Sequence, residues 1–268
     1  MNINLYMEMK KLIFGTMAAA LLAMPATTMA QDSVEPEVSI DFLSHYMWRG
    51  TDKGGITIMP AAKLSWKGAS VGLTGTTGIE SKDPKEINIA LGYKFGMFNV
   101  GITDYWTSGK DLMGNDVYFE WDSAKNGHQL EANFGVDFGF MTLQAYTIFW
   151  GNDFRYETLA DTENRTNGKR AFSTYIEARF PFYWKGIDWD VCAGVTPFKS
   201  ACYIESDGEM LHKNYFYADK PAIVMASVRA TKRMEVGEVK TPIFAELHTN
   251  PFLKHANFLI GISIQPFK

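Results

Sequence analysis

The chain has 268 residues, of which 46% are hydrophobic and 14% aromatic, and its formal net charge at pH 7 is −4. A nearly neutral chain without a basic cluster lacks the surface that nucleic acids bind, so nucleic-acid partners are excluded. No apolar run after Gln31 reaches the ~20 residues that a membrane-spanning helix needs, so helices do not hold the mature chain in a membrane.

The N-terminus has the order of segments typical of an export signal. Lys10 and Lys11 precede an apolar run of about thirteen residues that ends at Met24, and small residues follow up to Ala30. The run is too short for a membrane anchor. We therefore predict a signal peptide over residues 1–30 and a mature domain over residues 31–268.

The mature sequence alternates apolar with polar or small residues at a period of two, which is typical of strands with two different faces. In residues 86–95 the odd positions, from Ile87 to Phe95, are large and apolar, while the even positions are polar or small. We predict twelve such strands, over residues 38–49, 55–66, 69–79, 85–95, 97–107, 128–138, 141–150, 170–182, 187–198, 220–231, 240–249 and 256–265.

Alternation alone fits either a soluble sheet with its apolar face inward or an outer-membrane barrel with that face toward lipid. The strands are about ten residues long, many aromatic residues lie at their ends, and the polar face carries small residues that suit a lumen. The sequence therefore favours an all-β fold, a transmembrane antiparallel up-and-down β-barrel.

The connections alternate in length. Tight turns at 67–68, 96, 139–140 and 184–186 alternate with connections that include every long one, such as 108–127, 151–169 and 199–219. Outer-membrane barrels have short periplasmic turns and long outer loops, so both termini should lie on the periplasmic side. Residues 115–122 also alternate, and we assign them to a strand-like extension of the third outer loop, with a fourteen-stranded barrel as the alternative.

Two hairpins can be predicted in register. A turn at Gly96 pairs Tyr93 with Val100, and a turn at Gly139 pairs Val136 with Leu143, so apolar residues meet on one face. This register leaves Asp104 on the lipid side, where it must lie above the apolar band or be turned inward by a bulge. Eight side chains should be exposed on the outside: Ile87, Ile89, Leu91, Tyr93, Phe134, Val136, Ile260 and Ile262.

The stretch Ser44–Gly50, "SHYMWRG", has a Ser-x-Tyr-x-Trp-Arg-Gly pattern. It resembles the start of a family of Gram-negative exported proteins labelled Gcw_chp. The stretches "GHQLEANFGVDF" and "FSTYIEARFPF" also resemble strands of such proteins from Bacteroides-like bacteria. The resemblance implies an outer-membrane barrel and supplies no catalytic residues.

The alternation of strand 38–49 assigns faces to this motif. Tyr46 and Trp48 share the lipid face of Val38 and should lie at the upper rim, whereas His45 and Arg49 point to the lumen. Arg49 could belong to a lumenal binding pair, or it could be a solvated arginine beside an aromatic anchor.

Many charged residues fall on the lumenal face, with both signs represented. Such residues either form cross-strand ion pairs in a narrow barrel or line a wet pore. Reflection about the turn at 184–185 sets Arg179 nearly opposite Asp190, so we predict an ion pair between them. The lumen-lining candidates are His45, Arg49, Glu86, Lys94, Glu131, Glu177, Arg179, Asp188, Asp190, Arg229 and Glu246.

The sequence indicates no catalytic residues, metal site or cofactor. The histidines lack zinc spacing, and Cys192 and Cys202 could form a disulfide or remain free thiols. The favoured function is a small channel or binder for a polar small molecule. The protein would lie in the outer membrane of a Gram-negative bacterium and contact the lipid of that membrane. The alternatives are a lipid-modifying enzyme, with Ser44 and His45 as a candidate pair, and a structural or surface-interaction barrel.

Overall fold

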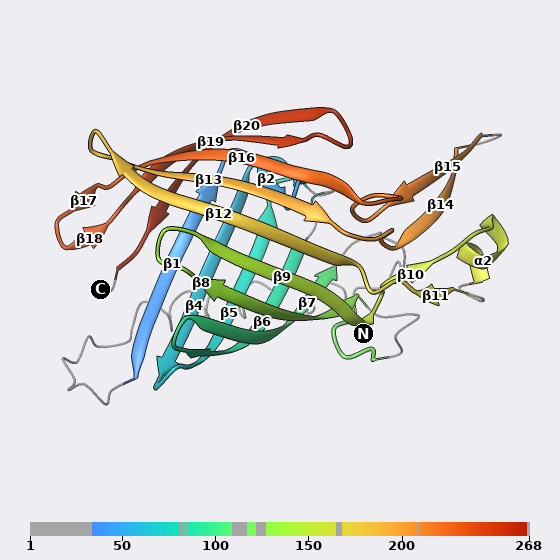
Figure 1. Ribbon diagram of the computed structural model, residues 1–268, viewed down its shortest axis with the longest axis horizontal. Helices are drawn as coiled ribbons and strands as arrows, with labels where there is room; N and C mark the ends of the chain where they lie inside the picture. The colour runs from blue at the N-terminus through green and yellow to red at the C-terminus, as the bar shows by residue number, and fades with distance from the viewer. Residues whose placement is uncertain are drawn as a thin grey trace, which may run out of the picture.

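The computed structural model describes residues 34–80, 83, 85–108, 117–121, 127–164, 168–207 and 210–266. Its main body is a closed antiparallel barrel of twelve strands in the ring order β1-β20-β19-β16-β13-β12-β9-β8-β7-β6-β5-β4 (Figure 1). These strands are β1 (Glu35–Leu43), β4 (Thr57–Trp66), β5 (Ala69–Gly78), β6 (Lys85–Phe95), β7 (Phe98–Ser108), β8 (His128–Asp137), β9 (Thr142–Gly151), β12 (Thr174–Trp184), β13 (Ile187–Thr196), β16 (Ala222–Lys232), β19 (Ile243–Asn250) and β20 (His255–Ile264).

The twelve-stranded barrel predicted from the alternation is confirmed. The predicted signal peptide, residues 1–30, lies outside the described residues. A search of the described part of the chain finds no helix of the length and apolar character required to cross a membrane.

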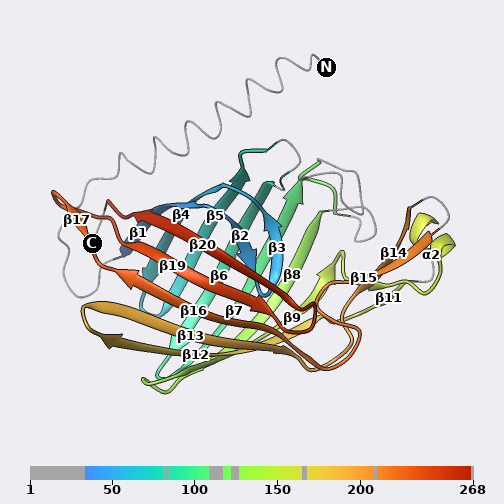
Figure 2. The same ribbon diagram turned by 90° about the horizontal axis from the view of Figure 1, so that it is seen from above.

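The connections divide the barrel into two ends. At the turn end, strands are joined by tight turns and by the short hairpin β17 (Glu235–Val236) and β18 (Val239–Lys240). The loop end carries a small sheet that projects from the barrel (Figures 1 and 2). The sheet has the order β11-β10-β14-β15 and comprises β10 (Phe154–Arg155), β11 (Lys169–Arg170), β14 (Cys202–Asp207) and β15 (Met210–Tyr215), with helix α2 (Leu159–Asn164) beside it.

Ion pairs tie the small sheet to its connecting segments. Glu157 accepts hydrogen bonds from Lys213 at 3.1 Å and Lys199 at 3.4 Å, and these ammonium groups lower the pKa of its carboxyl group. Cys202 is buried in this sheet and Cys192 in the barrel wall, and both are free thiols. The sequence left open whether Cys192 and Cys202 form a disulfide, and in the structure they do not.

The outside of the barrel is apolar. Of the eight residues predicted to face outward, Leu91 is 58% exposed and Ile260 54%, four others are also exposed, and only Ile87 and Val136 are partly covered. Apolar side chains on the outside of a closed barrel are stable in lipid and unfavourable in water. The predicted lipid face is confirmed.

An arginine on this face should be costly. Replacing Leu91 with arginine is expected to lower the free energy of unfolding by about 2–4 kcal/mol in phospholipid vesicles, because the guanidinium would enter hydrocarbon. Urea unfolding followed by tryptophan fluorescence measures the loss. The control is Ala90→Arg, on the adjacent residue that lines the lumen. Equal losses for the two variants would contradict the assignment of faces.

Both predicted hairpin registers are confirmed. Tyr93 pairs with Val100 across the first turn, and Val136 pairs with Leu143 across the second. The turns themselves have glycine in the left-handed region, with φ of 60° at Gly96.

Asp104 is accommodated in a way that the sequence did not suggest. It keeps a regular outward register between Ile89 and Leu130, so of the two arrangements expected for it the bulge is absent from β7. Its carboxylate lies 2.9 Å from Nδ1 of His128, a fully buried side chain. The charge is therefore shielded by an ion-pair partner on the neighbouring strand.

Residues 117–121 cover the pair of Asp104 and His128. They contain a turn and do not form the predicted strand-like extension. The ring of Trp121 stacks on the ring of His128 at 4.3 Å, and the carbonyl oxygen of Tyr118 lies 2.6 Å from Nε2 of His128. These contacts with His128 account for the departure of the segment from an extended strand. The rest of segment 115–122 lies outside the described residues.

Candidate functional site

The motif Ser44–Gly50 lies inside the lumen. The predicted strand 38–49 ends at Leu43, where Ser44 donates its backbone N–H to the Ile260 carbonyl and accepts a hydrogen bond from the Ile260 N–H. The chain then leaves the wall as a hairpin of β2 (Tyr46–Trp48) and β3 (Thr51–Gly54). We call residues 44–54 the lumen hairpin.

The tip of the lumen hairpin requires glycine. Arg49 and Gly50 have φ values of 48° and 81°, as expected for a tight hairpin turn. A Cβ atom on Gly50 would lie only 1.8 Å from the carbonyl oxygen of Val224 on β16. The backbone can therefore approach the wall this closely only where a side chain is absent.

The lumen hairpin reaches across the barrel. On one side the hydroxyl of Tyr46 donates to Glu86 of β6 at 2.9 Å. On the other side Gly50 lies against Val224 of β16 and donates its N–H to His248 Nε2 of β19 at 3.0 Å. Because β6 and β16 are six places apart in the ring of twelve strands, these contacts join opposite walls.

Arg49 is the buried centre of this contact. Its guanidinium donates to Glu131 Oε1 and to the Tyr217 hydroxyl, both at 2.9 Å. It also lies over the rings of Tyr146 at 4.0 Å and Trp48 at 4.6 Å. The side chains of Arg49 and Glu131 are 8% and 1% exposed, so this charge pair is withdrawn from water and stabilised by its partners and by the rings.

The prediction that Tyr46 and Trp48 face lipid is wrong. Tyr46 is buried against Glu86, and Trp48 packs in the lumen at 5.6 Å from Phe216 and 6.0 Å from Tyr217. The alternation that assigned their faces holds only while the chain stays in the wall, and the chain has left the wall at Leu43.

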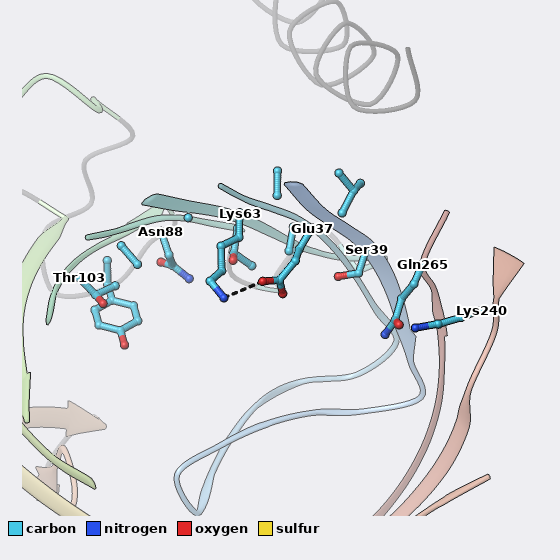
Figure 3. Close-up of a pocket in the computed structure, with 14 residues that line it drawn as sticks. Glu37, Ser39, Lys63, Asn88, Thr103, Lys240 and Gln265 are labelled. Atoms are coloured by element: carbon cyan, nitrogen blue, oxygen red, sulfur yellow. Dashed lines mark hydrogen bonds and ion pairs between the residues drawn. The ribbon is translucent and has the colours of Figure 1, made fainter. Parts of the chain in front are cut away.

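A polar cavity of about 620 Å³ occupies the lumen toward the turn end (Figure 3). Glu37 and Lys63 form an ion pair of 2.8 Å in its wall, and their side chains are 62% and 47% exposed, so the cavity is wet. Asn88, Lys240 and other polar residues share the lining with small and apolar residues such as Ala62 and Val38.

A second cavity of about 310 Å³ lies against the lumen hairpin, and we call it the hairpin chamber. Tyr105 lines both cavities. Arg179 donates to Asp190 at 2.8 Å in the chamber wall, so the predicted ion pair is confirmed. Seven of the predicted lumen residues line this chamber: His45, Arg49, Glu177, Arg179, Asp190, Arg229 and Glu246.

The remaining predicted residues lie elsewhere. Glu86 and Glu131 are buried against the lumen hairpin. Lys94 pairs with Asp137 at 3.4 Å and Asp188 with Arg233 at 2.5 Å, near the turn end, and neither Lys94 nor Asp188 lines the two cavities.

Two functional residues were missed by the sequence reasoning. His248 binds the hairpin tip and lies 2.9 Å from Glu246. Because it follows Glu246 by two positions on one strand, alternation could have assigned it to the lumen. Tyr217 lies in a connection without any periodic pattern, so no sequence signal indicated its contact with Arg49.

Ser44 and His45, the candidate pair for hydrolysis, contact other residues and not each other in the hydrogen bonds and ion pairs of the described residues. Ser44 Oγ accepts a hydrogen bond from the Ile260 N–H, and His45 Nε2 lies 2.9 Å from Asp52. A nucleophile needs its base within hydrogen-bonding reach. The described contacts place these two side chains in structural roles.

No family model matches the sequence, and no curated protein matches it. Among solved structures, the chain is similar to the NanC porin, with 11% identity, 87% of this chain and 100% of that chain covered, and a TM-score of 0.46. It is similar to an outer membrane channel from Pseudomonas putida F1, with 12% identity, coverage of 91% and 98%, and a TM-score of 0.41. It is also similar to an outer membrane phospholipase from Salmonella typhi, with 8% identity, coverage of 89% and 94%, and a TM-score of 0.38.

Proposed function

We propose that this protein is an outer-membrane channel of a Gram-negative bacterium that passes a small polar solute. The observation that carries the proposal is a wet polar cavity of about 620 Å³ inside a closed barrel whose outside is apolar. A barrel of this kind satisfies all backbone groups in lipid and keeps a polar interior.

The two ends of the barrel support the orientation. Outer-membrane barrels place short turns in the periplasm and long loops outside. The turn end would therefore face the periplasm, and the loop end, with the small sheet β11-β10-β14-β15, would face the medium. The predicted signal peptide over residues 1–30 is consistent with export.

The lumen hairpin limits the size of the solute. A solute that enters the cavity of about 620 Å³ would pass Tyr105 into the hairpin chamber of about 310 Å³. At ~30 Å³ per water molecule, the chamber holds only about ten waters. The channel should therefore conduct weakly and exclude solutes larger than a simple organic acid or a monosaccharide.

Conductance in planar lipid bilayers tests the proposal. The purified mature protein should give discrete openings of small, uniform amplitude, because ions share the wet path of the solute. Slower migration after heating in gel electrophoresis checks that the barrel is folded. Folded protein that gives no openings, and vesicles that stay impermeable to small polar solutes, would overturn the channel function.

We also propose that the chain belongs to the Gcw_chp-like family that Ser44–Gly50 resembles. The motif supplies both residues of the hairpin turn, Arg49 and Gly50, and Arg49 binds Glu131. Sequences that share the motif should therefore keep a carboxylate at the position of Glu131. Relatives with the motif and an apolar residue there would contradict this grouping.

A further inference from the structure

We infer that the hairpin chamber is an anion-selecting site that takes a small carboxylate-bearing solute through Arg179 and Arg229. The inference rests on the proposed channel function and names the substrate class of that channel. Two observations support it. Arginine and carboxylate side chains alternate across the strands of the chamber wall, in a row that we call the charge ladder, and the arginine side chains are more exposed than the carboxylate side chains.

The ladder crosses four neighbouring strands. Arg179 of β12 donates to Asp190 of β13 at 2.8 Å, and Asp190 is in register with Arg229 of β16. Arg229 in turn donates through Nε to Glu246 of β19 at 2.7 Å. Positive and negative groups therefore alternate along one wall, and all of them line the chamber.

The two signs are not equally accessible. The side chains of Arg179 and Arg229 are 40% and 41% exposed, whereas those of Asp190, Glu177 and Glu246 are 23%, 14% and 7% exposed. The arginine side chains are thus more exposed than the carboxylate side chains with which they pair. A solute in the chamber would therefore meet hydrogen-bond donors with positive charge before it meets acceptors.

The two arginines keep donors for a ligand. A guanidinium has five N–H groups, and Arg229 uses Nε and Nη2 on Glu246. Arg179 directs Nη1 to Asp190 and has Nη2 at 3.6 Å from Glu177. Arg229 also lies over the ring of Phe244 at 4.4 Å, which holds its planar group in place.

The chemistry of these donors favours a carboxylate. A carboxylate accepts two parallel N–H bonds from a guanidinium, whereas a neutral hydroxyl solute accepts weaker single bonds. Arg49 also lines the chamber, but its side chain is buried and donates to Glu131 and Tyr217, so it does not serve as a donor for the solute. Selection should thus depend on Arg179 and Arg229.

The test uses trifluoroacetate as the probe and detergent-folded full-length mature protein. Fluorine NMR lines should broaden with the wild-type protein, and excess acetate should reverse the broadening. In the double variant Arg179→Gln and Arg229→Gln, affinity should fall about tenfold or more, because the bidentate, charge-assisted bonds are lost. In Lys94→Gln, which removes an exposed lysine near the turn end, affinity should stay unchanged.

A second double variant, Arg179→Lys and Arg229→Lys, guards against misfolding because it keeps both charges on the wall. It should bind the probe more weakly than the wild type, since ammonium groups lack the fork geometry. Equal broadening in the wild-type and glutamine variants, or none in the folded wild-type protein, would overturn the inference. Binding does not require conduction, so this result is independent of bilayer recordings that test the channel function itself.

Discussion

Replacing Arg49 with alanine is expected to lower the free energy of unfolding by about 3–5 kcal/mol, because it leaves a buried charge without its partner. The side chain of Glu131 is only 1% exposed, and Arg49 is the cation that binds it. The hydroxyl of Tyr217 loses the same partner. Urea unfolding in lipid vesicles, followed by tryptophan fluorescence, measures the effect.

The matched control for this prediction is Arg179→Ala. Arg179 also pairs with a carboxylate in the lumen, but its side chain is 40% exposed. Its loss should cost only ~0.2–1 kcal/mol, since water replaces the partner. Equal losses for the two variants would show that the lumen hairpin is not held by its buried ion pair. Adding Glu131→Gln to Arg49→Ala should recover part of the loss, because the stranded charge is removed.

Shortening the lumen hairpin is expected to raise single-channel conductance several-fold. Replacing residues 47–53 with a two-glycine turn would remove the contacts of Gly50 with β16 and β19 and the ion pair of Arg49 with Glu131, while Tyr46 stays bonded to Glu86. Conductance rises with the open cross-section of the path, and this hairpin fills part of the lumen between opposite walls. Planar bilayer recordings compare the amplitude of openings with that of the full-length mature protein.

The control for the deletion is a hairpin of similar length at the same end. Shortening β14 and β15, which lie in the small projecting sheet and not in the barrel wall, should leave the conductance unchanged (Figure 2). If both deletions give wild-type amplitudes, the lumen hairpin does not form the constriction. The excess noise of a loosened loop can be separated from a true increase by comparing mean amplitudes.

The barrel wall could be read from the sequence because its rules are local. A strand turns successive side chains to opposite faces, so the run from Ile87 to Phe95 defines both a lipid side and a lumen side. A tight turn at Gly96 then fixes the register, and Tyr93 pairs with Val100 as predicted. The pairing of Arg179 with Asp190 follows from the same reasoning.

Part of the candidate site was accessible in the same way. Arg229 and Glu246 lie on wall strands, and alternation assigned them to the lumenal face that lines the hairpin chamber. Which of the lumenal charges pair, and which guanidinium groups stay open to a solute, depends on neighbouring strands that are far apart in the sequence. Exposure of Arg229 but burial of Glu246 is a property of the assembled wall.

The path of the lumen hairpin across the barrel depends on tertiary structure alone. Nothing local at Leu43 marks the point where the chain leaves the wall, and the alternation continues through Tyr46 and Trp48 as if they faced lipid. The contacts that hold the hairpin join Arg49 to Glu131, 82 residues away, and Gly50 to His248, 198 residues away. Alternation describes neighbours along one strand, whereas a buried ion pair across the lumen exists only once the barrel has closed around it.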